Sequence, residues 1–390
     1  MVESRGAGEG RSRPRWRRWA AVALGFAASI EVLSWIAFAT GILRDDYAVH
    51  GIVSPEHLRN QGLAWRSEVE PWGAWHVPGS SSRHAKTCFD VVYRSNDVGA
   101  RSSFDFGPGT PEHAIVALGD SFVEGYGLPE SSTFTTRLQA RLDRPVLNFG
   151  SAYAFGPVQY HLVYEGLASR FRHDAVVVAF LPANDFSDND PASMRLYGRR
   201  NRPYYREAGD AGYAIFYPEG SERSPSLGPG DGASWLRSQV VRSAAMRLYG
   251  KLRLLSQDSG RSPVAEASQW FSAPLARQKA AVHFLERVIS SAIGRGAKDV
   301  IVLGIPSAID FDEARLAGRS PEEPWWVGHL RSLERRWPQY RFVNGFDVDA
   351  SPSAVARRFL PCDPHWSPEG ADEAARLVAD ALRRGRDPQR

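Results

Sequence analysis

Apolar and polar positions along the chain fall into three regions. From Trp19 to Leu43 the residues are almost all apolar, which predicts a helix of about 37 Å at 1.5 Å per residue, long enough to cross a bilayer. Residues 44–111 show no sustained period, although the run FDVVY has the length of a strand. From residue 112 to 385, short apolar runs alternate with segments of helical period. The pattern predicts a transmembrane helix, a juxtamembrane segment and one large α/β domain.

The apolar runs of the third region have the length of buried strands. They lie at residues 113–121, 145–150, 174–182, 298–306 and 340–348. Helical periods lie between and after them, at residues 131–142, 156–171, 273–295, 325–337 and 367–384. Strands that alternate with helices are typical of right-handed β-α-β units, which form a parallel sheet covered on both faces. Residues 186–270 interrupt the alternation with many Arg, Tyr, Gly and Pro residues, and we interpret them as an insertion.

Charges beside the apolar stretch predict its orientation. A basic cluster, RSRPRWRR, precedes the stretch, and two aspartates follow it. Because positive charge marks the inner side of a membrane helix, we expect residues 1–18 to be a cytoplasmic tail and residues 19–43 a single-pass anchor. The rest of the chain is then extracytoplasmic, in the periplasm or at the cell surface. A cleaved signal peptide is the alternative, because Ala37-Phe38-Ala39 resembles a cleavage site, but the length of the stretch favours a retained anchor.

Glu31 lies in the middle of the apolar stretch. A carboxylate inside a membrane costs free energy and often marks a contact. We hypothesise that Glu31 faces a polar or basic group on a partner membrane protein, and a membrane acyltransferase is the partner we expect. The alternatives are that Glu31 is protonated there, or that the helix is cleaved.

Composition excludes some classes of protein. The formal net charge is +4, and much of the excess lies in the first 18 residues, so nothing indicates nucleic-acid binding. The two cysteines, Cys88 and Cys362, are too few and too far apart for a zinc cluster. They form either one disulfide or two free thiols, and the sequence leaves both open.

Three predicted loops carry polar residues suited to catalysis. Gly119-Asp120-Ser121-Phe122 follows the first strand, Asn184-Asp185 follows the third, and Asp363-Pro364-His365-Trp366 precedes the last helix. Working residues of parallel α/β sheets lie on loops at the carboxyl ends of strands. These three loops therefore predict a single site.

The residue types in these loops fit nucleophilic catalysis. Ser121 is the predicted nucleophile, His365 its base, and Asp363 the acceptor that orients the imidazole. An oxyanion needs hydrogen-bond donors aimed at it. We expect these from the Ser121 backbone N–H, from the Asn184 side chain, and from a backbone N–H in the loop at 150–156. Gly150 and Gly156 are the candidates in that loop, although either glycine can instead simply permit a turn.

Four blocks of the sequence resemble those of the SGNH (GDSL-like) hydrolase superfamily. They are G-D-S-F at 119–122, N-F-G with G-P-V-Q at 148–159, N-D at 184–185 and D-P-H-W at 363–366. The resemblance implies a flavodoxin-like α/β/α fold and Ser-His-Asp ester chemistry without a metal or cofactor. The D-x-H-W spacing and the N-x-x-G-x-R element at 96–101 resemble membrane-anchored bacterial proteins that act in O-acetylation of exported polysaccharides.

The chain departs from the family pattern in two places. The glycine usual in the second block falls on Tyr153 or Ala154, so the identity of its oxyanion donor is open. Pro182 stands where the third block commonly has glycine.

We expect an acyl-ester hydrolase or O-acyltransferase that acts on an extracytoplasmic carbohydrate, either acylated or acyl-accepting. The insertion is rich in aromatic residues and arginines, which suit sugar rings and anionic groups, although most of these aromatics are expected to pack the insertion onto the domain. The alternatives are a lipase or thioesterase, and a non-catalytic carbohydrate-binding or assembly protein on the same scaffold.

Overall fold

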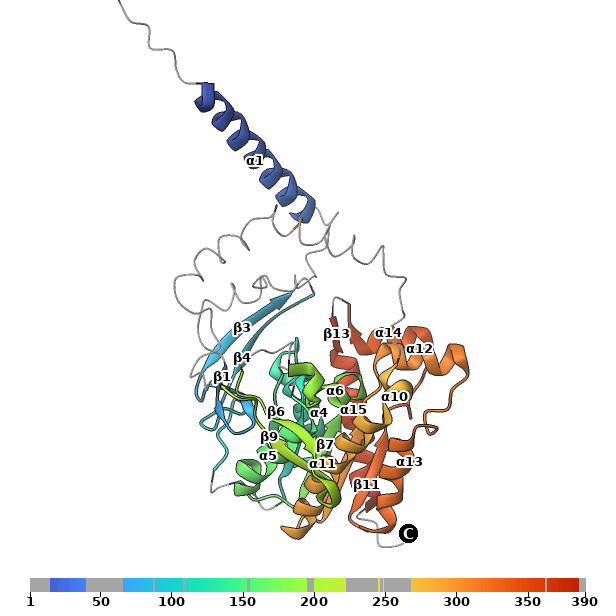
Figure 1. Cartoon of the computed structure of the whole chain (residues 1–390). Coiled ribbons are helices and arrows are strands. Elements are labelled where there is room, and N and C mark those ends of the chain that lie inside the picture. The colour runs from blue at the N-terminus through green and yellow to red at the C-terminus, as the bar shows by residue number, and fades with distance from the viewer. Residues whose placement is uncertain are drawn as a thin grey trace, which may run out of the picture. The chain divides into compact units, whose positions relative to one another are not determined.

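The computed structural model describes residues 15–39, 66–86, 88–107, 110–111, 113–152, 155–194, 200–221, 245, 248, 268–361 and 363–385. The chain divides into two compact units (Figure 1). Met1–Pro55 and Asp231–Ser262 form the first, and Glu56–Gly230 and Pro263–Arg390 form the second. The predicted division at residues 18, 43, 111 and 385, with an insertion at 186–270, stays a prediction.

The first unit contains one long helix, α1 (Arg15–Ala39). Its stretch Trp19–Ala37 is long and apolar enough to cross a membrane, a property that a signal sequence shares. Glu31 accepts a hydrogen bond at 3.1 Å from the backbone N–H of Ala245, in the second segment of the same unit. The carboxylate therefore has a contact within its own chain, and the hypothesis of a partner membrane protein stays a hypothesis.

The second unit is built on a five-stranded parallel sheet. Its strands are β5 (Ile115–Gly119), β6 (Val146–Gly150), β7 (Ala175–Phe180), β10 (Asp299–Gly304) and β11 (Tyr340–Asn344). They lie in the order β11-β10-β7-β5-β6, and all neighbouring pairs are parallel. Numbered along the chain this order is 2-1-3-4-5, the flavodoxin-like arrangement. The five predicted strands and the fold class are confirmed.

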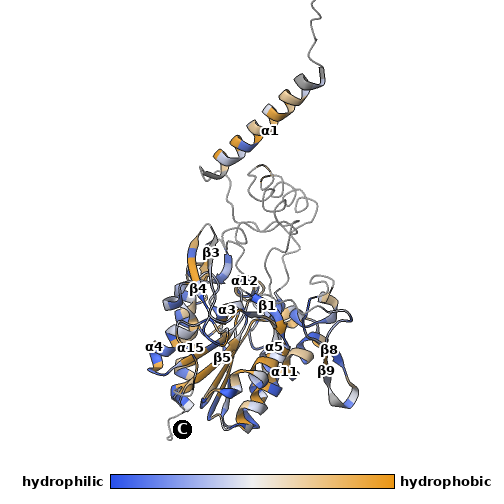
Figure 2. Cartoon of the chain, turned by 90° about the vertical axis from the view of Figure 1, so that its left-hand side faces the viewer, coloured by the Kyte–Doolittle hydropathy of each residue, from blue (hydrophilic) through white to orange (hydrophobic). Residues whose placement is uncertain are grey.

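Helices cover both faces of the sheet and bury one hydrophobic core on each. One face carries α4 (Phe134–Leu142) and α15 (Pro368–Gly385), and the other carries α5 (Pro157–Gly166), α11 (Leu275–Gly294) and α13 (Trp325–Ser332). Successive side chains of a strand point to opposite faces, so Ile115 and Ala117 pack into one core while Val116 and Leu118 pack into the other. Figure 2 shows the resulting apolar sheet between helices of mixed hydropathy.

Shorter helices and a two-residue strand lie between the sheet strands and near the C-terminus. They are α3 (Ser121–Glu124), α6 (Pro182–Asp188), α10 (Gln269–Ser272), α12 (Ala308–Ala317), α14 (Pro352–Arg358) and β12 (Phe359–Leu360). The predicted loop at 363–366 is instead a short strand, β13 (Asp363–Trp366), which pairs with β12.

Besides the β12–β13 pair, the described residues form three antiparallel hairpins outside the sheet. Two fall in the region predicted to lack a period, β1 (Arg66–Glu70) with β2 (Gly73–His76), and β3 (Ser81–Lys86) with β4 (Phe89–Arg94). The third, β8 (Tyr204–Glu207) with β9 (Tyr213–Phe216), belongs to the predicted insertion.

One of the two cysteines lies at the turn between β3 and β4. Cys88 is disulfide-bonded, and Cys362, the only other cysteine in the sequence, lies outside the described residues. Of the two alternatives left open for Cys88, the structure has the disulfide.

Candidate active site

The strand order places the predicted site at the point where the chain changes direction across the sheet. After β5 the chain forms β6 on one side, and β7 then pairs with β5 on the other. A crevice forms at the carboxyl ends of strands at such a switch point. Ser121 begins the short helix that follows β5, and Asn184 lies on the helix that follows β7.

The three residues predicted for nucleophilic catalysis lie in hydrogen-bond contact. Ser121 Oγ is 2.7 Å from His365 Nε2, and His365 Nδ1 contacts Asp363 Oδ1. Asp363 Oδ1 also accepts the backbone N–H of His365 at 3.0 Å. With the proton on Nδ1, the imidazole donates to Asp363 and accepts from the Ser121 hydroxyl, which is the arrangement that a general base needs.

Aromatic side chains fix the plane of the imidazole. The ring of Tyr126 stacks on that of His365, with centroids 4.0 Å apart and planes 22° from parallel. Phe122 contacts both His365 and Trp366, at centroid distances of 5.0 and 4.9 Å. Both rings come from the segment 122–126 that follows Ser121, so this segment orients the imidazole.

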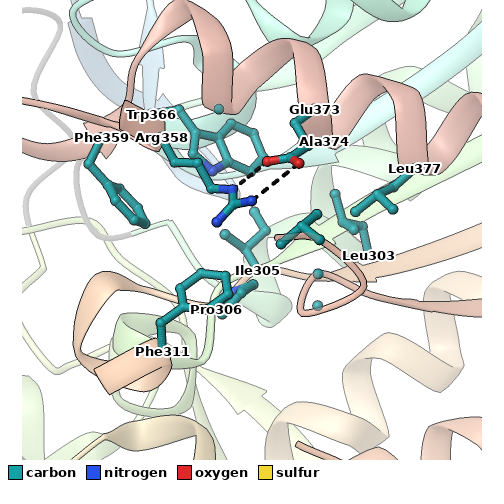
Figure 3. Close-up of a pocket in the computed structure, with 14 residues that line it drawn as sticks. Leu303, Ile305, Pro306, Phe311, Arg358, Phe359, Trp366, Glu373, Ala374 and Leu377 are labelled. Carbon is teal, nitrogen blue, oxygen red and sulfur yellow. Dashed lines mark hydrogen bonds and ion pairs between the residues drawn. The ribbon is translucent and has the colours of Figure 1, made fainter. Parts of the chain in front are cut away.

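A small cavity of about 30 Å³ lies beside Trp366. Figure 3 shows Arg358 paired with Glu373 there, with a distance of 3.2 Å from Arg358 Nη2 to Glu373 Oε1. A cavity of this size holds about one water molecule. Its lining contains none of Ser121, Asn184 and His365, so it lies beside the predicted site and does not open into it through these side chains.

Two of the predicted oxyanion donors lie beside the nucleophile. Ser121 is the first residue of α3, and the first N–H of a helix has no acceptor within the helix. Asn184 Nδ2 donates to Asp120 Oδ2 at 3.2 Å. The other oxygen of Asp120 accepts the Phe122 backbone N–H at 2.9 Å, so Asp120 ties the asparagine to the nucleophile turn. The second hydrogen of the Asn184 amide remains to donate to a ligand.

The two glycines predicted as further donors are engaged within the protein. The Gly150 N–H donates to Asn148 Oδ1 at 3.0 Å, and the Gly156 N–H donates to Gln159 Oε1 at 3.1 Å. A Cβ on Gly150 would lie 2.3 Å from the Glu124 backbone nitrogen, so this glycine is needed for the close approach of α3 to β6. The predicted role of Gly150 and Gly156 as oxyanion donors stays a prediction. In this conformation both N–H groups already donate to side chains of the protein. Residues 153–154 lie outside the described residues.

A buried carboxylate next to the nucleophile was not predicted from the sequence. Glu124 is fully buried, and both its oxygens accept from Arg66 Nη2, at 2.7 and 2.9 Å. His76 Nε2 lies 3.4 Å from Glu124 Oε1, and the Ala152 N–H donates to Oε2. Burial raises the pKa of this carboxyl, but Arg66, His76 and the hydrogen bonds outweigh burial and hold the pKa below its usual range.

The upstream N-x-x-G-x-R element has a physical explanation in these contacts. Asn96 Oδ1 accepts the backbone N–H groups of Val98 and Ala100, at 3.2 and 2.9 Å, and so closes a turn. Gly99 has φ of +75°, and a Cβ there would lie 2.4 Å from the His76 carbonyl oxygen. Arg101, almost fully buried, then donates through Nη1 to the Glu124 carbonyl at 2.7 Å. The element therefore supports the end of the nucleophile helix.

Most described aromatics of the insertion are buried or half-buried, while Tyr217 is 38% exposed. Tyr204 is 1% exposed, and Tyr213 contacts both Tyr205 and His283, at centroid distances of 5.6 and 5.3 Å. Their packing agrees with what we expected for most aromatics of this segment. Tyr197 and Trp235 lie outside the described residues.

Three buried carboxyl groups lie at and below the site. Burial raises the pKa of Asp120 to about 6 and that of Asp188 to about 7. Burial, with repulsion from these two carboxylates, raises the pKa of Asp185 well above its ordinary value. Asp185 accepts hydrogen bonds from the Tyr160 hydroxyl at 2.8 Å and the Leu181 N–H at 2.7 Å. The cluster makes stability depend on pH.

We expect Asp188 to contribute a fall in stability as the pH rises from about 4 to about 7, opposed by His76 and His161, whose pKa burial lowers. Asp188 keeps its proton up to about pH 7 in the folded state but loses it near 3.8 when unfolded, so the folded state binds more protons over this interval. Between pH 4 and pH 7, the free energy of unfolding of Asp188→Asn should therefore change more favourably than that of the wild type, by about 2–4 kcal/mol. Unfolding in urea at several pH values measures it, and Asp312→Asn, at an exposed ion pair, is the control. The same pH dependence of stability in Asp188→Asn and in the wild type would refute the raised pKa of Asp188.

Comparison with known proteins gives matches among solved structures alone. No family model matches the chain, and no curated protein matches it. The chain is similar to a member of the lipolytic protein G-D-S-L family from Veillonella parvula, with 11% identity, 70% of this chain and 99% of that chain covered, and a TM-score of 0.37.

Two further solved structures are similar to the same extent. A lipase/acylhydrolase from Enterococcus faecalis has 14% identity, with 71% of this chain and 99% of that chain covered, and a TM-score of 0.35. A GDSL-like lipase from Bacteroides thetaiotaomicron has 10% identity, with 70% and 89% covered, and a TM-score of 0.33. These likenesses are distant, and the class of the site rests on its own geometry.

Proposed function

We propose that the protein is an SGNH-type serine acyl-ester hydrolase or O-acyltransferase that acts on an extracytoplasmic carbohydrate. The observation that carries the proposal is the contact of Ser121 Oγ with His365 Nε2 at 2.7 Å, while Asp363 holds the other ring nitrogen. Acyl transfer through a covalent intermediate needs a nucleophile that is hydrogen-bonded to a base, and a carboxylate that orients this base.

In the first half of the proposed reaction, Ser121 Oγ attacks the carbonyl carbon of the ester. His365 Nε2 takes the hydroxyl proton, and Asp363 stabilises the imidazolium that forms. The Ser121 backbone N–H and the second hydrogen of the Asn184 amide donate to the oxyanion. His365 then gives its proton to the leaving alcohol, which departs and leaves the acyl group on Ser121.

In the second half, the oxygen of a second molecule attacks the acyl carbon while His365 takes its proton. The bond from that carbon to Ser121 Oγ then breaks, and His365 returns the proton to Ser121 Oγ. Water as the attacking molecule makes the protein an esterase, and a sugar hydroxyl makes it an O-acyltransferase. The outcome depends on water exclusion and on acceptor binding. The carbohydrate is favoured because the D-x-H-W block and the N-x-x-G-x-R element resemble anchored proteins of polysaccharide O-acetylation, which work with a membrane acyltransferase partner.

Two alternative functions make different demands on the site. A non-catalytic carbohydrate-binding protein has no need for Ser121 and His365 to stay in contact, so the contact favours an enzyme. A lipase or thioesterase would share the contact of Ser121 with His365 and would differ in needing an apolar site for a long acyl chain.

The test is turnover of p-nitrophenyl acetate by the detergent-solubilised full chain, with and without added oligosaccharide, beside Ser121→Ala. We expect release of nitrophenol that depends on Ser121. Acetyl groups that appear on the sugar identify a transferase, and their absence during turnover identifies an esterase. Equal release by the wild type and Ser121→Ala would refute the catalytic proposal.

A further inference from the structure

A cavity of about 420 Å³ opens at the carboxyl edge of the sheet, one strand away from the nucleophile. Its walls come from the segments that follow β7 and β10 and from the start of α10 and α11. They include Ala183, Ser187, Ser268, Gln269, Arg277 and Ser307. Ala183 and Ser187 lie on α6, the helix that also carries Asn184. The cavity therefore adjoins the proposed oxyanion donor.

The serine hydroxyls of this cavity present oxygen lone pairs. Ser268 Oγ and Ser307 Oγ both donate to the Asp310 carboxylate, with the second contact at 2.8 Å. Ser187 Oγ donates to the Asn184 carbonyl at 2.9 Å. A hydroxyl that has given its single hydrogen to a neighbour can only accept from a ligand. The walls thus offer acceptors for the O–H groups of a bound molecule.

Arg277 supplies donors to the same cavity. Its Nε donates to Asp190 Oδ2, and a guanidinium carries four further N–H groups. Asp190, which pairs with Arg277, and Asp310 in the wall more than offset the charge of Arg277, so the lining does not select an anion. Ile309, which is 41% exposed, adds an apolar surface. Acceptors, donors and an apolar face together match a sugar ring, whose hydroxyls both donate and accept, better than an acyl chain.

We propose that this cavity, which is lined in part by α6, binds a neutral sugar residue of the carbohydrate substrate. The volume lies within the range of small-molecule sites. The inference rests on the proposed function for its choice of substrate, and it adds the place where the sugar binds. Arg277, Ser187, Ser268 and Ser307 then determine specificity for hydroxyl-rich substrates.

Binding is best measured without turnover, in the full-length chain that carries Ser121→Ala. The probes for calorimetric titration are glucose, galactose, mannose and N-acetylglucosamine, together with their β-1,4-linked tetramers. We expect at least one to bind. Ala183→Phe, which fills the cavity, and Arg277→Ala, which removes its donors, should each weaken that binding at least tenfold.

The matched control is Arg295→Ala, because Arg295 lies beyond the end of α11 in a surface ion pair with Glu165. It should change the dissociation constant by less than about twofold, in line with the small worth of surface pairs. Absence of binding by every sugar, or binding that both cavity variants leave unchanged, overturns the inference. Competition by octanoate for the same cavity also overturns it. If a sugar binds this cavity but the wild type shows no turnover that depends on Ser121, the proposed function is refuted and the binding site is not.

Discussion

Ser121→Ala, His365→Ala and the double variant are expected to lose the same large share of kcat, about 10³-fold to 10⁶-fold. The two residues act through one contact, between Ser121 Oγ and His365 Nε2. Once either partner is gone, the serine is not activated, and removal of the other has nothing further to abolish.

Rates of p-nitrophenyl acetate turnover measure this effect, with thermal unfolding as a check that each variant folds. His329→Ala and Ser169→Ala are matched controls, because both side chains make contacts away from the site. Losses that multiply in the double variant would show that Ser121 and His365 act independently, and the triad assignment would then be wrong.

Glu124→Gln is expected to lower the free energy of unfolding by about 3 kcal/mol, because it leaves the cation of Arg66 without its buried partner. The substitution keeps an oxygen that can accept the Ala152 N–H, so it isolates the effect of charge. Because Glu124 is the last residue of α3, the helix that begins at Ser121, kcat should fall by on the order of 10–100-fold while KM stays nearly constant.

Urea unfolding and steady-state kinetics together separate a structural from a positioning role. Glu165→Gln, at a half-exposed ion pair, is the control and should cost at most about 1 kcal/mol. The pair Arg66→Met and Glu124→Gln should together cost less than the sum of the single effects, because the two groups are in contact. An unchanged kcat in a less stable Glu124→Gln protein would restrict Glu124 to stability alone.

The sheet, and the contact of Ser121 and Asp363 with His365, were predictable because each signal in the sequence is local. Buried strands such as residues 175–180 are continuous apolar runs, and each polar loop directly follows or precedes an element. The partnership of Arg66 with Glu124 has no such signal, since 58 positions separate them and each looks like an ordinary surface charge in the sequence. The acceptors of Gly150 and Gly156 are close in sequence, at Asn148 and Gln159, but the conformation of the folded loop decides which side chain turns toward each N–H.

Ser121 and His365 are separated by 244 positions, and this distance has a consequence for biosynthesis. At 5–20 residues per second, a ribosome needs roughly 12 to 50 s to pass from the codon of the serine to that of the histidine. For that time the nascent chain carries a hydroxyl without a base. A chain interrupted before residue 363 lacks the two residues that the proposed mechanism requires beside Ser121, so we expect incomplete products of translation to be inert toward esters.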